Sequence, residues 1–139
     1  MKMIKPGSTI AIALLLSGLP ALAHHSGAAY FELDVDIEHT NATVVEYHIV
    51  NPHGRLVYTF TDNDGNEVEW SGELASANNL RRRGLGGEIF KPGDQLALVV
   101  GNPARSGANF SRLTRVEFAN GDVAQLTGRS TGITRANAE

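Results

Sequence analysis

The sequence contains no cysteine, and its only two methionines are Met1 and Met3. Without cysteine no disulfide can hold the fold, and no thiolate is available as a nucleophile or metal ligand. Beyond its first three residues the chain therefore offers a metal only nitrogen and oxygen ligands, which excludes sites for soft metals. Apolar runs long enough for a membrane-spanning helix, which needs roughly 20 such residues, are also missing.

Basic residues are too few to balance the acidic ones. The chain has 12 Lys and Arg against 15 Asp and Glu, which gives a formal net charge of -3. An acidic chain is a poor candidate for nucleic-acid binding, because neutralising the phosphates needs a basic surface. We therefore expect no nucleic-acid partner.

The start of the chain has the pattern of a secretory signal peptide. Lys2 and Lys5 provide positive charge, an almost wholly apolar run covers residues 10–16, and the small-residue triplet ALA follows at residues 21–23. This order is typical of an exported protein that is cleaved after the triplet. We predict a periplasmic location, no membrane span after cleavage, and His24 as the new N-terminus. Loss of two lysines leaves 10 basic and 15 acidic residues, a charge of about -5.

Hydrophobic periodicity predicts a fold built mostly of β-strands. YFELDVDIE, residues 30–38, alternates strictly and indicates a half-buried strand or extended arm, which HTN at residues 39–41 interrupts. Strands follow in ATVVEYHIV, RLVYTFT and NEVEWSGE, the last two joined by the turn DNDG. Trp70 shares a strand face with Val68, so we expect it in the core.

A short helix in SANNLRRRG separates these strands from QLALVVG and from a final hairpin with the turn ANGD. Three strands, a helix and two or three more strands is the order of an OB-fold. We predict an all-β fold with small α content, an OB-like, partly open Greek-key barrel of five to six strands with one short helix. The alternative is an open β-sandwich. Residues 24–127 would form one domain with an N-terminal arm at 24–38, and residues 128–139 a flexible polar tail.

Several motifs together carry a family resemblance. They are AHHS, VVEYHIVNPH, ASANNLRRRG, KPGD and GNPARSG, in that order. The chain resembles the exported bacterial proteins known as domain of unknown function 6152. The resemblance implies a periplasmic location and a small β-rich domain, and it implies no particular activity. His24 and His25 match the opening of that family and His53 matches its Asn-Pro-His turn, whereas His48 departs from the pattern.

All five histidines lie near the start of the predicted mature chain, at residues 24, 25, 39, 48 and 53. An N-terminal His24 would offer its α-amine and Nδ1 to one metal ion, and an imidazole such as that of His53 would complete an all-nitrogen site. Such a set favours Cu(II), which prefers tetragonal nitrogen coordination. Alternatively, the imidazole of His25 could bind together with the amine and the intervening amide. Cu(II) is therefore the candidate cofactor.

The weak point of this site is distance. A strand rises roughly 3.3 Å per residue, so one straight strand from residue 31 to 50 would carry His53 far from His24. The break at residues 39–41 must then fold the arm back, and otherwise His39 is the nearer third ligand. The competing interpretation is two histidines that bind copper weakly on a mobile terminus, with His53 bonded within its own turn.

Arginines form a second candidate site. Arg81, Arg82 and Arg83 lie on the short helix, and a surface loop presents Arg105. Arginine pairs well with carboxylate and phosphate groups, so these residues could contact an anion or a partner. The alternative function is therefore a metal-free OB-like interaction module for an envelope partner or an anionic ligand. Ordinary surface salt bridges would explain the same residues.

Catalysis has little support in the sequence. Ser71 lacks the strand-turn-helix context of a nucleophile elbow, and carboxylates such as Glu67 and Glu69 are more often solvated than paired. We expect a binding protein rather than an enzyme, although a copper-dependent oxidase would use the same histidine ligands.

Overall fold

Seven strands, one α-helix and one 3-10 turn make up the part of the chain that the computed structural model describes, residues 26–129 and 131–137. In chain order they are η1 (Gly27–Ala29), β1 (Ile37–His48), β2 (Arg55–Thr61), β3 (Glu67–Glu73), α1 (Ala77–Arg82), β4 (Gln95–Pro103), β5 (Phe110–Phe118), β6 (Val123–Gln125) and β7 (Gly132–Thr134). The prediction of an all-β fold with one short helix is confirmed. Within the described residues no helix is both long and apolar enough to cross a membrane.

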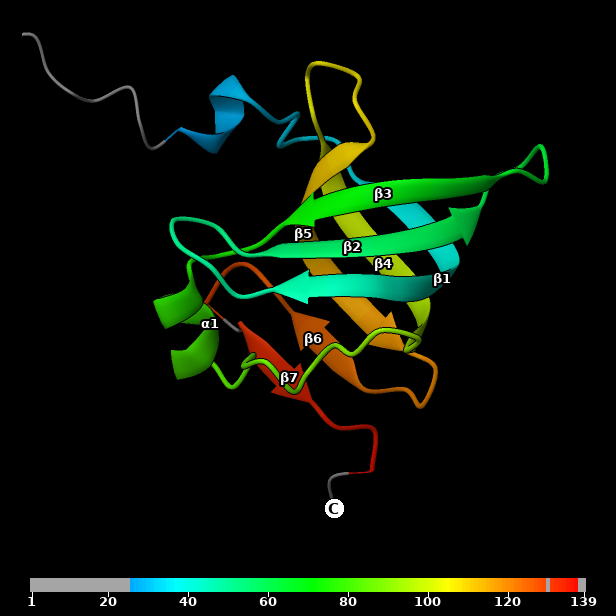
Figure 1. Cartoon of the computed structure of the whole chain (residues 1–139). Helices are drawn as coiled ribbons and strands as arrows, with labels where there is room; N and C mark the ends of the chain where they lie inside the picture. Colours follow the sequence, from blue (N-terminus) through cyan, green and yellow to red (C-terminus); the bar gives the residue numbers. More distant parts are fainter. Residues whose placement is uncertain (1–25, 130, 138–139) are drawn as a thin grey trace, which may run out of the picture.

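The first five strands close into a barrel (Figure 1). Their order is β3-β2-β1-β4-β5, and β5 returns to pair in parallel with β3. With α1 between β3 and β4 in the chain, this is the OB-like order that the sequence predicts. The barrel is closed rather than partly open, and the short strands β6 and β7 extend the sheet beyond β5.

Closure of the barrel depends on Gly72, at the point where β3 meets β5. A Cβ atom at this position would lie 2.4 Å from side-chain carbons of Leu113, far inside van der Waals contact. Glycine is therefore required where the two strands approach. The pairing runs from Ser71↔Phe110 to Glu73↔Arg112, so the end of β3 lies beside the start of β5.

The barrel interior is filled by large apolar side chains, and Tyr58, Phe90 and Leu56 are the largest that are fully buried. Trp70 is partly buried and packs against this core, as predicted, while its Nε1 donates to Ser111 Oγ at 3.0 Å. Burial of these side chains supplies the main driving force for folding. The core thereby holds the strand ends in fixed positions.

Two local predictions were wrong. Residues 39–41 do not interrupt a strand, because β1 runs through them while residues 37–43 pair with β4. Asn41 takes a φ of 53° there, and residues 32–36 before β1 contain a turn rather than a strand. The expected flexible tail is also partly structured, because residues 132–134 form β7 against β6. At residues 39–41 pairing with the distant strand β4 outweighs the local sequence signal, and at residues 132–134 pairing with the neighbouring strand β6 does so.

Candidate functional site

The start of the described chain packs against one end of the barrel. Glu32 N donates to Pro103 O at 3.0 Å, and Arg105 N donates to Tyr30 O at 2.9 Å. Phe31 adds a β-bridge to Ala104. These bonds direct η1 toward the turn that joins β1 to β2, and Figure 1 shows this turn between η1 and α1.

Arg105 fastens this arm with its side chain. Its Nε donates to Ala28 O at 2.8 Å and its Nη1 contacts Glu32 Oε1 at 2.7 Å. The sequence offered Arg105 as a contact for an anion or partner, but in the structure its guanidinium is occupied by the chain itself. Its evident role is to position η1.

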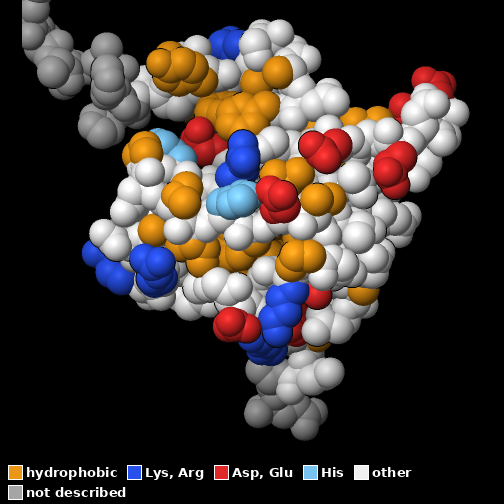
Figure 2. All heavy atoms as spheres, viewed as in Figure 1, with side chains coloured by type: hydrophobic (Ala, Val, Ile, Leu, Met, Phe, Trp, Pro, Cys, Tyr) orange, Lys and Arg blue, Asp and Glu red, His pale blue; other side chains and the backbone are white. Residues whose placement is uncertain are grey.

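A cavity of about 360 Å³ separates the arm from the β1–β2 turn, and both Ser26 and His53 line it. The other lining residues are aromatic, polar or small: Gly27, Tyr30, Phe31, Glu73 and Phe110. Figure 2 shows hydrophobic side chains gathered at this end of the molecule next to histidine and acidic side chains. The arm reaches His53 because β3 and β5 pair and close the barrel beside it. The predicted break at residues 39–41 is not the cause, since β1 runs through them.

His53 is held in place by the backbone around it. Gly54 N donates to Ala75 O and Leu74 N donates to Gly54 O, both at 2.9 Å. Asn51 Oδ1 accepts from Ala77 N at 3.1 Å, which ties the turn to the start of α1. The Asn-Pro-His-Gly motif therefore works as a clamp between β3 and α1, and it presents His53 on the surface.

The ring of His53 faces a carboxylate. Its Nδ1 lies 3.4 Å from Glu73 Oε1, and the two side chains are 57% and 25% exposed. This separation is a close contact rather than a hydrogen bond. Histidines that bind metals commonly have a carboxylate near the ring nitrogen that does not face the metal.

The other histidines are placed differently. His24 and His25 lie outside the described residues. His48 contacts Glu46 Oε2 at 2.6 Å on the exposed surface. Among the described residues no group of three or more His, Cys, Asp or Glu side chains is arranged to hold a metal. The sequence-predicted ligands His24 and His25 would have to reach His53 from outside the described residues.

His39 belongs to an aromatic cluster instead of the cavity. Its ring stacks on Phe60 with centroids 3.9 Å apart, and Trp70 meets it edge-on at 4.6 Å. Its Nδ1 lies 3.0 Å from Tyr58 Oη, and burial lowers the pKa of His39 below its usual 6.5. The structure thus excludes His39 from the lining of the His53 cavity.

A second cavity, of about 230 Å³, shares His53 and Glu73 with the first. Arg83 and Arg112 both line it, whereas Arg81 and Arg82 do not. Of the three helix arginines named from the sequence, only Arg83 lines the cavity that contains His53 and Glu73.

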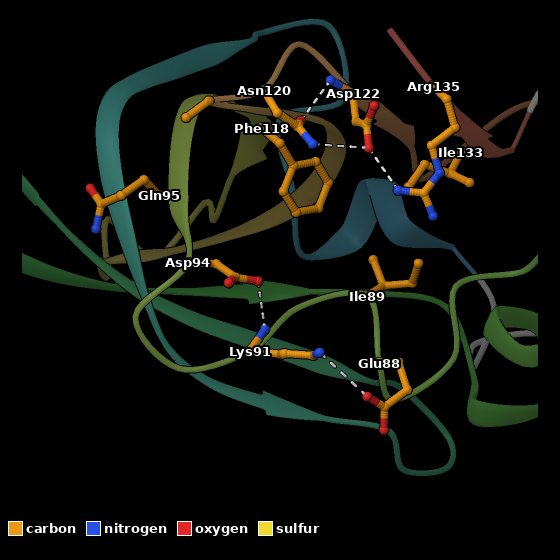
Figure 3. Close-up of a pocket in the computed structure, with 11 residues that line it drawn as sticks. Glu88, Ile89, Lys91, Asp94, Gln95, Phe118, Asn120, Asp122, Ile133 and Arg135 are labelled. Atoms are coloured by element: carbon orange, nitrogen blue, oxygen red, sulfur yellow. Dashed lines mark hydrogen bonds and ion pairs between the residues drawn. The ribbon is translucent and has the colours of Figure 1, made fainter. Parts of the chain in front are cut away.

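A third cavity, of about 360 Å³, lies elsewhere on the barrel and is drawn in Figure 3. Its cations are already neutralised: Lys91 Nζ lies 3.6 Å from Glu88 Oε2, and Arg135 Nη1 lies 2.6 Å from Asp122 Oδ2. Figure 3 shows both pairs on the cavity wall. Because both lining cations already face a carboxylate, this cavity offers an anion little.

Sequence reasoning missed Glu73. A signal for it was present, because a hairpin centred on DNDG sets the register of β2 against β3. That register pairs Arg55 with Glu73 and so brings the carboxylate close to His53, two residues earlier. The sequence did not show that β5 and the arm would also lie beside the end of β3 and the β1–β2 turn.

Comparison with known proteins gives one match. A family model described as a family of unknown function, DUF6152, matches residues 11–112, which confirms the resemblance seen in the motifs. No curated protein and no solved structure matches the chain.

Proposed function

Because the chain belongs to DUF6152, a family whose description assigns no activity, we propose a function from the site alone: an exported protein that binds Cu(II) without catalysis. The α-amine and Nδ1 of His24 supply two ligands after cleavage behind residue 23. His53 Nε2 supplies a third nitrogen. The imidazole of His25 is the alternative third ligand.

The observation that carries the proposal is that Ser26 and His53 line one cavity. Successive Cα atoms are about 3.8 Å apart, so the Cα of His24 is at most about 7.6 Å from that of Ser26. An amine and imidazole starting at that distance have the reach to enter the same cavity. This bound supports a site in which His24 and His53 share one metal ion.

The ligand chemistry supports Cu(II) over other ions. Two imidazoles and an amine form an all-nitrogen set, and Cu(II) heads the affinity series of divalent metals for such ligands. The amine has an ordinary pKa near 7.7–8.0, so a strong Lewis acid displaces its proton readily at neutral pH. The carboxylate of Glu73, 3.4 Å from His53 Nδ1, is placed to orient the ring and adds negative charge near the cation.

Binding without turnover is the simpler function for this cavity. Of the described residues that line it, only Glu73 has a carboxylate, and this group faces His53. The remaining polar side chains there are hydroxyls. We therefore assign the described residues to holding and orienting the third ligand.

Electron paramagnetic resonance and calorimetric titration with CuCl2 test the proposal on protein that begins at His24. We expect one tight Cu(II) site with nitrogen hyperfine structure. His53→Ala should remove one coupled nitrogen and weaken binding, whereas His48→Ala should change neither. His48 is a suitable control because it is also exposed and also faces a carboxylate, Glu46. An unchanged spectrum and affinity in His53→Ala would overturn the role of His53.

A further inference from the structure

Beyond metal binding, we propose that the second cavity, behind His53, is a site for a small oxyanion, a phosphate or carboxylate group held by Arg83 and Arg112. The cavity lies where five parts of the fold meet: the β1–β2 turn, the end of β3, the end of α1, the start of β5 and the segment between β6 and β7. Its residues with polar side chains are His53, Glu73, Asn79, Arg83, Arg112, Thr127 and Thr131.

The composition of this wall favours an anion. Asn79, Thr127 and Thr131 can donate hydrogen bonds, and Arg83 and Arg112 add forked guanidinium donors that match an oxyanion in shape. A volume of about 230 Å³ suits a compact ion better than a nucleotide or a drug-sized ligand, whose pockets span about 300–1,000 Å³.

The two arginines carry charge that the described part of the chain does not neutralise. Neither forms an ion pair within 4 Å there, although Arg105, Arg115 and Arg135 all do. Among the described residues Glu73 is the only carboxylate that lines the cavity, and it faces His53. Two positive groups against one negative group leave the wall with a net positive charge.

The cavity in Figure 3 differs in how its cations are paired. There each lining cation, Lys91 and Arg135, lies within 4 Å of a carboxylate on the same wall. In the second cavity two guanidinium groups line one small space without such partners, and their mutual repulsion is relieved by an anion between them. In the Figure 3 cavity each lining cation thus has a carboxylate partner, whereas in the second cavity neither arginine has one among the described residues.

The backbone fixes where both arginines start. Arg112 lies in β5 between the fully buried residues Ser111 and Leu113 and is itself half-buried. Arg83 N donates to Asn79 O and Leu80 O at the end of α1. A Cβ added at Gly27 would lie 3.8 Å from Arg112 Nη1, so this guanidinium reaches the arm beside the proposed copper site.

Calorimetric titration of metal-free protein tests the oxyanion site, with sodium phosphate and sodium oxalate as probes and sodium chloride at matched ionic strength. We expect saturable binding of one probe or both, and the preferred probe identifies the ligand class. Arg83→Gln and Arg112→Gln should each weaken it about 10- to 150-fold, since a charge-assisted hydrogen bond contributes about 1.5–3 kcal/mol.

Two matched variants serve as controls. Arg81→Gln removes a charge from the same helix, and Arg115→Gln removes one from the same strand, where Arg115 pairs with Glu117 at 3.3 Å. Both should retain wild-type affinity, and thermal unfolding confirms that each variant is folded. No saturable binding, or equal losses in all four variants, would overturn the proposal. Because no metal is present, either result leaves the copper proposal untouched.

Discussion

Glu73 Oε1 lies 3.4 Å from His53 Nδ1, across the junction between the end of β3 and the turn that precedes β2. The hairpin register that pairs Arg55 with Glu73 creates this contact, and the bonds of Gly54 to the segment after β3 maintain it. The pair lies on the wall of both cavities at this end of the barrel. It is therefore the link between the metal proposal and the anion proposal.

Replacing Glu73 tests whether this contact orients a metal ligand. Glu73→Gln should weaken Cu(II) binding about 10- to 100-fold, the usual effect of losing a group that orients a metal-bound histidine. Glu46→Gln is the matched control, because Glu46 makes the same kind of contact with His48, at 2.6 Å, outside the lining of the cavity. Calorimetry measures both, and equal affinities for the two variants would argue against an orienting role.

Gly72→Ala tests the closure of the barrel. The added methyl group would lie 2.4 Å from Leu113, and overpacking of this kind typically costs about 1–3 kcal/mol. We expect a lower free energy of unfolding in urea and weaker Cu(II) binding, because the β3 end that carries Glu73 must shift. Gly86→Ala is the control, since a Cβ there meets no atom within 4 Å. Wild-type stability of Gly72→Ala would contradict the packing described here.

His39 should make stability depend on pH. Burial lowers its pKa in the folded state below 6.5, so the unfolded chain binds the proton first as the pH falls. The stabilising contribution of neutral His39 is present above pH 6.5 and is lost as the pH drops toward the folded pKa. Urea unfolding between pH 7.5 and 5 should therefore show a smaller loss in His39→Phe than in wild type. Identical slopes for the two proteins would refute the assignment.

Asp122 should anchor β7. Its carboxylate accepts hydrogen bonds from Ala136 N at 2.9 Å and Arg135 Nη1 at 2.6 Å, and these bonds hold the pKa of Asp122 below its usual value. The stabilisation is present above the ordinary aspartate pKa and is lost as the pH falls through the lowered one. At neutral pH, Asp122→Asn should speed amide hydrogen exchange in Gly132–Thr134, while Asp94→Asn should not. Unchanged exchange in Asp122→Asn would show that β7 is held by other contacts.

Local signals in the sequence predicted most of the fold. Alternation predicted β2 and β3, and DNDG predicted their turn. Ser76 caps α1 by accepting a hydrogen bond from Asn79 N at 3.4 Å. These features depend on neighbouring residues, so a sequence pattern records them. The same holds for His53, whose motif marks a surface turn.

Contacts between distant segments were harder to predict. No local pattern shows that Phe110 will lie beside Ser71, yet this pairing closes the barrel and brings the arm to His53. Likewise the pairing of β1 with β4 carries the strand through residues 39–41, where local residue preferences favour a break. The sequence therefore predicts which residue types could bind a metal. It does not predict that pairing of β3 with β5 brings the arm to His53.

The central claim is that His24 binds Cu(II) through its α-amine as well as its ring, next to His53. Competition with a chromogenic chelator should be measured for protein that begins at His24 and for the same protein with one alanine added before it. The extension keeps every histidine but replaces the amine by an amide. We expect it to weaken binding by about tenfold or more, equivalent to about 1.4 kcal/mol or more. The affinity of the unextended protein should also fall between pH 8 and 6, as protons compete for the nitrogens. Equal affinities for the two proteins would contradict the account.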